Sequence, residues 1–169
     1  VTPIQQVTAV SAVVNGGKLY QPYILKSISE KETGNIIKKN SKKFIRQTIS
    51  RETSNTMRRA LENVVAKGGG KAAYIDGYRI GGKTGTSEPI NNSKDGYTAS
   101  FLAISPVENT QIVLLVILKS PGEGVNHNGG QIAAPTAGKM LSEILPYMGI
   151  NNGNKDTGNN TNISENELY

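Results

Sequence analysis

The chain has 169 residues, enough for one domain with a hydrophobic core, and it contains no cysteine, which excludes a disulfide framework and thiol chemistry. No apolar run approaches the ~20 residues of a membrane-spanning helix, and the first residue is Val1 rather than an initiator methionine. The net charge is +6, and basic residues cluster at 38–46 without a set of interleaved aromatic side chains. We therefore expect a solvated basic face and no nucleic-acid partner.

The first predicted element is a helix over residues 2–15. Thr2 is a suitable N-cap, Pro3 fits the first helical position, and Gln5 completes a capping-box pattern. Asn15 and the two glycines that follow it end the helix. Both ends of this element are therefore encoded locally.

An extended hairpin is predicted next. Residues 19–28 have the composition of a strand, residues 32–35 that of a turn, and Ile36 with Ile37 begins the returning strand. Residues 38–43 are all Lys, Asn or Ser, so we expect them to be exposed.

Two further helices are predicted. One has Ser50 as its N-cap and ends at the glycine run 68–70, with apolar residues at three- and four-residue spacing between these points. The other starts at about Pro135 and is ended by Pro146 and Gly149, and its apolar residues fall on one face. We expect this last helix to pack on a sheet.

The stretch 78–118 organises the rest of the chain. Lys83-Thr84-Gly85-Thr86 is followed by a polar turn at 91–96 and by two apolar runs, 97–105 and 111–118. Such runs bounded by turn residues are typical of buried strands, so we predict a three-stranded antiparallel meander with Lys83 to Thr86 on its first strand. A cation and two hydroxyls beside a glycine can grip a carboxylate by charge-assisted hydrogen bonds, and the glycine lets a ligand approach the backbone.

The same stretch allows a nucleotide-binding interpretation. Residues 77–84 match the phosphate-binding pattern G-x-x-x-x-G-K-[ST]. That motif requires a helix directly after it, whose N-terminus faces the phosphate. Gly85, Pro89 and Gly96 follow instead, without helical periodicity between them. A P-loop protein is therefore the alternative and not the preferred hypothesis.

His127 is the only histidine, and it lies between Asn126 and Asn128 in a predicted loop. No second histidine, cysteine or carboxylate cluster accompanies it in the sequence, so we predict a solvated histidine and no metal site. The sequence implies no cofactor.

Four stretches, in matching order, resemble class B penicillin-binding proteins. They are residues 1–20, the approach to a K-T-G box at 63–86, and the segments 98–106 and 129–135. The resemblance covers residues 1–149 and implies an α+β fold, an antiparallel sheet flanked by helices. This chain would supply only the C-terminal part of that penicillin-binding/β-lactamase-like transpeptidase fold.

The resemblance also assigns roles to the box. Lys83 would supply positive potential and contact the serine of an S-x-N motif, Thr84 and Thr86 would bind a carboxylate, and Gly85 would let the substrate lie along the strand. The backbone N–H of Thr86 would be an oxyanion donor. Lys83 and Thr86 are thus the candidate catalytic residues, and Lys83, Thr84, Gly85 and Thr86 the candidate substrate-binding residues. The implied activity is that of a serine D,D-transpeptidase, which crosslinks peptidoglycan through an acyl-enzyme.

The nucleophile of that chemistry is missing. No serine is followed three residues later by a lysine, and the one S-x-N match, Ser164-Glu165-Asn166, follows the box instead of preceding it. We therefore expect a piece of a longer protein, inactive without the N-terminal half of the same domain. An edge of the meander would lack its partner strand, which predicts marginal stability or self-association. A non-catalytic wall-binding module is a further alternative.

Residues 150–169 are mostly Asn, Gly, Thr and Glu, and they are predicted to form a disordered tail or a linker. The resemblance implies the extracytoplasmic face of a bacterial membrane, reached through an anchor outside this chain. It implies peptidoglycan stem peptides and β-lactam antibiotics as partners. D,D-carboxypeptidases share the box, so transpeptidation rests on the flanking similarity.

Overall fold

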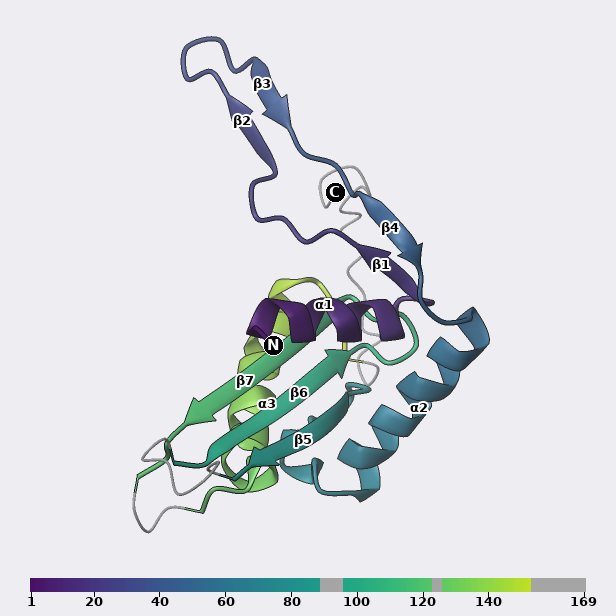
Figure 1. Ribbon diagram of the computed structural model, residues 1–169, viewed down its shortest axis with the longest axis vertical. Helices are drawn as coiled ribbons and strands as arrows, with labels where there is room; N and C mark the ends of the chain where they lie inside the picture. Colours follow the sequence, from purple (N-terminus) through teal and green to yellow (C-terminus); the bar gives the residue numbers. More distant parts are fainter. Residues whose placement is uncertain (89–95, 123–125, 153–169) are drawn as a thin grey trace.

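The computed structural model describes residues 1–88, 96–122 and 126–152. Its elements, in chain order, are α1 (Pro3–Val14), β1 (Lys18–Tyr20), β2 (Ser27–Ser29), β3 (Ile36–Lys39), β4 (Phe44–Gln47), α2 (Arg51–Lys67), the 3-10 turn η1 (Lys71–Ala73), β5 (Gly81–Ser87), β6 (Thr98–Ser105), β7 (Ile112–Lys119) and α3 (Gly129–Tyr147). Figure 1 shows a body built on β5, β6 and β7, from which an arm made of β1 to β4 projects. The α+β fold is confirmed.

The body is organised around the predicted three-stranded antiparallel meander. Its strand order is β5-β6-β7, with Thr84 opposite Phe101 and Phe101 opposite Val116. Successive side chains on a strand point to opposite faces. The face that carries Phe101 and Val116 joins a core with buried residues of α3, among them Ala137 and Leu141. Figure 1 shows α3 behind the sheet and α1 crossing in front of one end of it.

The first two helices begin and end where their sequence signals predict. In α1 the Thr2 hydroxyl accepts from the Gln5 N–H at 3.4 Å, and the Thr2 N–H donates to Gln5 Oε1 at 2.8 Å, which completes the capping box. In α2 the Ser50 hydroxyl accepts from the Thr53 N–H at 3.0 Å, and Gly68 is the C-cap. Local polar contacts therefore set these boundaries.

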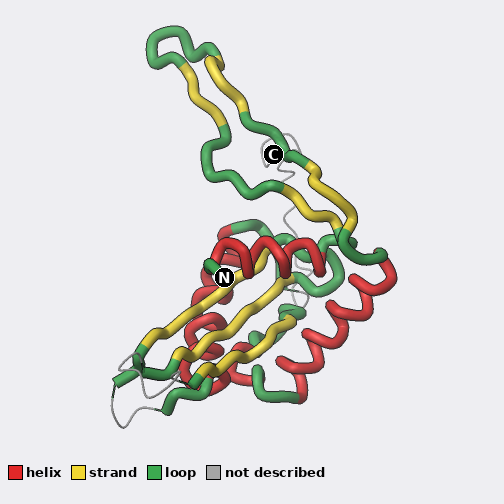
Figure 2. Tube along the Cα trace, in the orientation of Figure 1, coloured by secondary structure: helices red, strands yellow, loops and turns green. Residues whose placement is uncertain are grey.

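The single strand predicted over 19–28 is wrong. Two short strands replace it, and residues 21–26 between them are not strand. Pro22 has no N–H to give to a ladder and interrupts the strand. β1 pairs with β4 and β2 pairs with β3, so the hairpin is a two-part arm (Figure 2). The returning strand at Ile36 is confirmed, whereas β4 was not predicted.

The start of the last helix is also corrected. α3 begins at Gly129, six residues before the predicted Pro135, and Asn128 is its N-cap, with Oδ1 accepting from the Gly130 N–H at 2.8 Å. The glycine pair has the composition of a turn, but a Cβ atom on Gly129 would collide with the carbonyl oxygens of Ser100 and Gly85. Only a residue without a side chain lets the helix start this close to the sheet. The helix ends at Tyr147, between the two predicted end signals Pro146 and Gly149.

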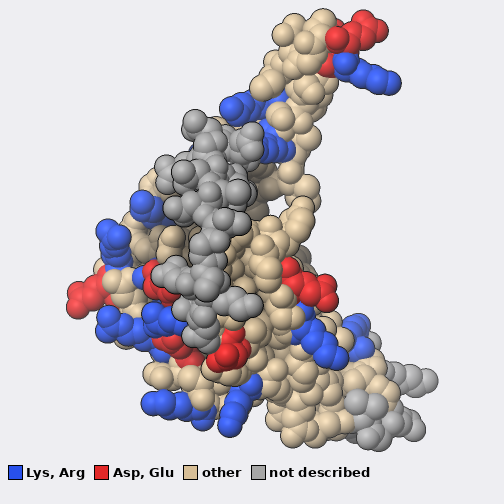
Figure 3. All heavy atoms as spheres, turned by 180° about the vertical axis from the view of Figure 1, so that it is seen from behind, with Lys and Arg blue, Asp and Glu red and all other residues tan. Residues whose placement is uncertain are grey.

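The arm and the body differ in charge. In the space-filling view from behind, Lys and Arg lie along the arm, while Asp and Glu are seen on it only near its outer end (Figure 3). No helix in the described parts of the chain is both long and apolar enough to cross a membrane. Most of the polar turn at 91–96, most of the tail at 150–169 and the Ser164 motif lie outside the described residues.

We expect Phe101→Ala to destabilise the protein by about 3–5 kcal/mol, because it deletes a large, fully buried ring between the sheet and α3. Met140→Ala on the exposed side of α3 is the matched control and should change the free energy of unfolding by about 0.5 kcal/mol or less. Chemical denaturation of the protein that contains this chain measures both. Equal losses would contradict this account of the core.

Candidate functional site

The four predicted site residues all lie on β5, as the sequence indicates. β5 pairs with β6 on one side, from Gly81 opposite Ile104 to Ser87 opposite Thr98. Among the described residues no strand pairs with its other side. Alternate N–H and C=O groups of an edge strand therefore point away from the sheet, where they can pair with an extended ligand. β5 continues from Thr84 to Ser87, so no helix directly follows Thr84 and the P-loop interpretation is wrong.

Lys83 and the two threonines occupy opposite faces of this strand. Thr84 and Thr86 share the face of Phe101, against α3, whereas Lys83 and Gly85 belong to the other face. The Lys83 side chain is exposed, and its Nζ donates to the carbonyl oxygen of Thr84 at 2.8 Å. The ammonium group thus bends toward the strand backbone, and a positive charge and two hydroxyls lie on neighbouring residues.

The start of α3 orients the hydroxyl of Thr86. The Gly129 N–H donates to Thr86 Oγ1 at 3.2 Å. Because this oxygen already accepts a hydrogen bond, the hydroxyl proton remains available for a second acceptor. The N-terminus of α3 also places partial positive charge beside the strand. This contact was not predicted from the sequence, although Asn128 before two glycines is a helix-start signal that can reveal it.

Close packing explains the glycine of the box. A Cβ atom on Gly85 would lie 2.5 Å from Ser100 Oγ, a group that donates to the Gly85 carbonyl at 3.5 Å. Gly82, three residues earlier, faces the Phe101 ring in the same manner. The two glycines on β5 therefore let its neighbour β6 approach, whatever ligand the strand binds.

An ion-pair cluster fixes the segment that leads into β5. The Arg79 guanidinium makes two 2.7 Å hydrogen bonds to the Glu62 carboxylate on α2, and it lies 3.4 Å from a Glu108 oxygen after β6. The carbonyl oxygen of Arg79 accepts from the N–H of Val107 at 3.1 Å. The hydrogen bond from Arg79 lowers the pKa of Glu62, against the opposing effect of burial, and the same bond raises the pKa of Arg79. These contacts connect three elements next to the box.

His127 lies near the far end of β5. It is exposed, as predicted, and its ring stacks on Tyr97 with centroids 3.8 Å apart and an interplanar angle of 6°. Tyr97 directly precedes Thr98, the partner of Ser87 at the end of β5. Within the described ranges, no group of three or more His, Asp and Glu residues is placed to hold a metal ion.

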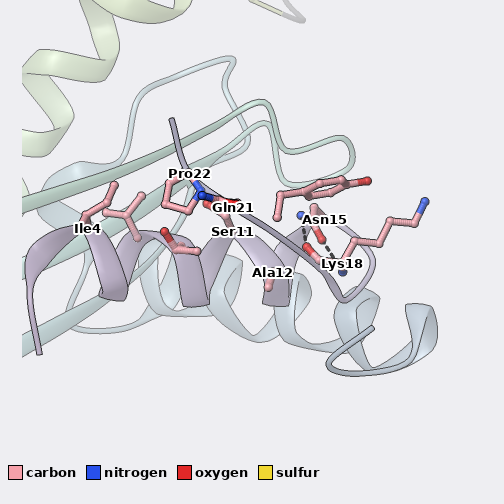
Figure 4. A pocket seen from close by; sticks show the side chains of 10 residues that line it. Ile4, Ser11, Ala12, Asn15, Lys18, Gln21 and Pro22 are labelled. Carbon is pink, nitrogen blue, oxygen red and sulfur yellow. Dashed lines mark hydrogen bonds between the residues drawn. The ribbon is translucent and has the colours of Figure 1, made fainter. Parts of the chain in front are cut away.

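Two shallow hollows lie away from the box. One, of about 230 Å³, lies between α1 and the chain from β1 to Pro22, and Figure 4 shows Ile4, Ser11 and Ala12 of α1 beside it. The other, of about 260 Å³, lies between α2 and the residues before β5. Neither of these two hollows is lined by a box residue.

The family follows from comparison with known proteins. The model of the penicillin-binding protein transpeptidase domain matches residues 1–142. Stage V sporulation protein D of Bacillus subtilis (strain 168) is 44% identical over 153 residues, covering 89% of this chain and 24% of that protein. The peptidoglycan D,D-transpeptidase FtsI homolog of Mesostigma viride is 29% identical, covering 85% and 26%. The chain belongs to the family of penicillin-binding protein transpeptidase domains.

Solved structures agree with this assignment. The D,D-transpeptidase domain of a peptidoglycan glycosyltransferase from Eggerthella lenta has a TM-score of 0.74 at 27% identity, and the match covers 88% of this chain and 33% of that one. The transpeptidase domain of penicillin-binding protein 3 from Burkholderia pseudomallei has a TM-score of 0.70 at 27% identity, covering 90% and 44%. The chain spans about a quarter of the length of the curated relatives it matches.

We expect the Glu62–Arg79 pair to make the free energy of unfolding decrease at acidic pH. Because the folded state lowers the pKa of Glu62, the contribution is present above the unfolded pKa and is lost as pH falls through the folded one. Both side chains are partly exposed, which limits the effect to about 1 kcal/mol. Urea unfolding should show Glu62→Gln less stable than the parent at pH 7 and equal to it at pH 2. Glu143→Gln, on α3, is the control, and an unchanged gap at both pH values would contradict this assignment.

Proposed function

We propose that this chain is the C-terminal part of a serine D,D-transpeptidase domain, which crosslinks peptidoglycan stem peptides and reacts with β-lactam antibiotics. The family assignment supports the class of enzyme. The open edge of β5, with Lys83 and two threonine hydroxyls on neighbouring residues, is the observation that carries the proposal. In this proposal the transpeptidase part ends near residue 149 and the rest is a tail or linker.

The reaction divides acyl transfer into two steps. A serine oxygen attacks the carbonyl carbon of the penultimate D-alanine, a base takes the serine proton, and the terminal D-alanine leaves with a proton on its nitrogen. An amine of a neighbouring stem peptide then attacks the ester, which forms the crosslink and returns the proton to the serine. No serine of this chain has a lysine three residues later. The nucleophile and its base therefore belong to residues outside this chain, in the other half of the domain.

Each box residue has a physical role in this scheme. The exposed ammonium of Lys83 attracts the substrate carboxylate and contacts the serine of the other half. The hydroxyls of Thr84 and Thr86 donate to that carboxylate, and the Gly129 N–H holds Thr86 Oγ1 as an acceptor so that its proton points to the ligand. The backbone N–H of Thr86 is an oxyanion donor, and the ligand extends along the strand beside Gly85.

The location follows from the substrate. Peptidoglycan lies outside the cytoplasmic membrane, so the domain acts on the extracytoplasmic face, and a membrane anchor belongs to another part of the protein. The other half of the domain is then a partner that this chain requires.

We expect Thr86→Val, in the protein that contains the nucleophile, to slow acylation by benzylpenicillin roughly 10- to 100-fold. A hydrogen bond to a charged group contributes about 1.5–3 kcal/mol, and valine keeps the shape of threonine. Acylation by the methyl ester of benzylpenicillin, which lacks the carboxylate charge, should fall much less. Thr86→Ser should retain most of the parental rate. Equal losses with both ligands would make Thr86 a packing residue.

The isolated chain should not be labelled covalently by a fluorescent penicillin, because it lacks the serine-lysine pair. The protein with both halves should be labelled, and heat denaturation before labelling is the control. Size-exclusion chromatography of the isolated chain should show association or partial unfolding, because β7 also has an edge without a strand neighbour in the described part. Covalent labelling of the isolated chain, or cooperative melting of a monomer, would contradict the division of the domain.

A further inference from the structure

The arm, defined as residues 18–47, makes few contacts with the rest of the structure. Its base packs on α1 through β1, but β2 and β3 contact each other and no further element of the described structure. Every residue from 21 to 39 is exposed. Figures 1 and 2 show the two outer strands directed away from the sheet and its helices. An isolated two-stranded hairpin is at best marginally stable in water, so an additional contact is expected to hold it.

The arm exposes an excess of apolar side chains. Eight of the fifteen large hydrophobic residues that are exposed in the described structure belong to it: Tyr23, Ile24, Leu25, Ile28, Ile36, Ile37, Phe44 and Ile45. Ile36 and Ile37 are adjacent on β3 and are 60% and 69% exposed. Exposed apolar side chains concentrated on one projecting segment indicate an interaction site.

The net charge of the whole chain resides in the arm. The arm has eight Lys and Arg and two Glu, whereas the remaining residues have eleven basic and eleven acidic side chains, so the arm alone accounts for the formal charge of +6. Glu30 directly precedes the turn at the tip, and Glu32 lies within it. A surface that is both basic and apolar complements a partner that is acidic and apolar.

The backbone of the arm restricts the class of partner further. β2 and β3 form a two-stranded sheet, so each has an edge with unpaired N–H and C=O groups. A lipid surface offers no strand that could pair with these groups in register, and the tip that would enter it first carries the two glutamates. A second copy that adds antiparallel along β3 would place Lys38 and Lys39 opposite isoleucines and offer them no acidic side chain. A polypeptide with acidic side chains satisfies the backbone, the charge and the apolar groups together.

We propose that the arm binds an acidic, extended segment of a partner protein, which adds as a strand along β3. Ile36 and Lys38 share one face of β3, and Ile37 and Lys39 share the other. An antiparallel strand with the order Glu-Glu-Val-Val places valines beside the isoleucines and carboxylates beside the lysines on both faces. The proposal rests on the arm alone and does not depend on the function of β5.

The test measures binding of a fluorescein-labelled eight-residue peptide with Glu-Glu-Val-Val at its centre to the whole protein by fluorescence anisotropy. We expect saturable binding that weakens at least tenfold when both valines are replaced by serine, or both glutamates by lysine. Two peptides with backbone N-methyl groups, each at a different set of alternate central residues, separate strand addition from charge attraction. One set blocks the N–H groups that face β3, and the other set blocks those that face away. Only one of the two should lose binding.

Variants of the arm complete the test. Lys38→Glu with Lys39→Glu should weaken binding at least tenfold, and so should Ile36→Ser with Ile37→Ser. Lys71→Glu with Lys139→Glu, which makes the same change of charge on the body, should not. Penicillin labelling and the melting temperature of each variant show that the body is intact. No binding to the whole protein, equal losses with the body variant, unchanged binding of the serine peptide, or preference for phosphatidylglycerol vesicles would each overturn the proposal.

Discussion

The N-terminus of α3 lies directly against β5 and β6, and much of the body depends on this contact. Gly129 has no Cβ atom, which lets the helix start beside the carbonyl oxygens of Gly85 and Ser100. The same residue donates its N–H to Thr86 Oγ1 at 3.2 Å. The contact that closes the core on one face of the sheet therefore also fixes a hydroxyl of the box. A substitution at Gly129 acts on the fold and on the site together.

The edge of β5 is prepared by elements that are distant in sequence. Glu62 of α2 forms an ion pair with Arg79, which lies just before β5. Val107, after β6, donates its N–H to the carbonyl oxygen of Arg79. The buried Phe101 ring fills the space over Gly82, next to the box. One edge of β5 is thus held in place while its other edge has no strand partner in the described structure. A preorganised edge of this kind loses little conformational entropy when an extended ligand binds.

Local signals predicted much of this structure. Thr2 with Gln5, and Ser50 with the glycines at 68–70, set the two helices correctly because caps act within a few residues. Apolar runs between turns predicted the meander and placed Lys83 to Thr86 on its first strand. The prediction of a single strand over 19–28 was wrong because Pro22 has no N–H for the ladder and interrupts the strand. β4 is four exposed residues with little strand pattern, so its pairing with β1 had no clear local signal. The Arg79–Glu62 pair joins residues 17 positions apart, and the early start of α3 needs Ser100 and Gly85 beside it.

The central claim is that the outer edge of β5 receives an extended ligand that carries a carboxylate. Hydrogen exchange of the whole protein, followed by mass spectrometry before and after acylation by benzylpenicillin, tests this most directly. The account predicts slower exchange in peptides that cover residues 83–87, because outward amides gain a partner, and no change in peptides from the arm at 18–47. Acylation that leaves the exchange of 83–87 unchanged would contradict it.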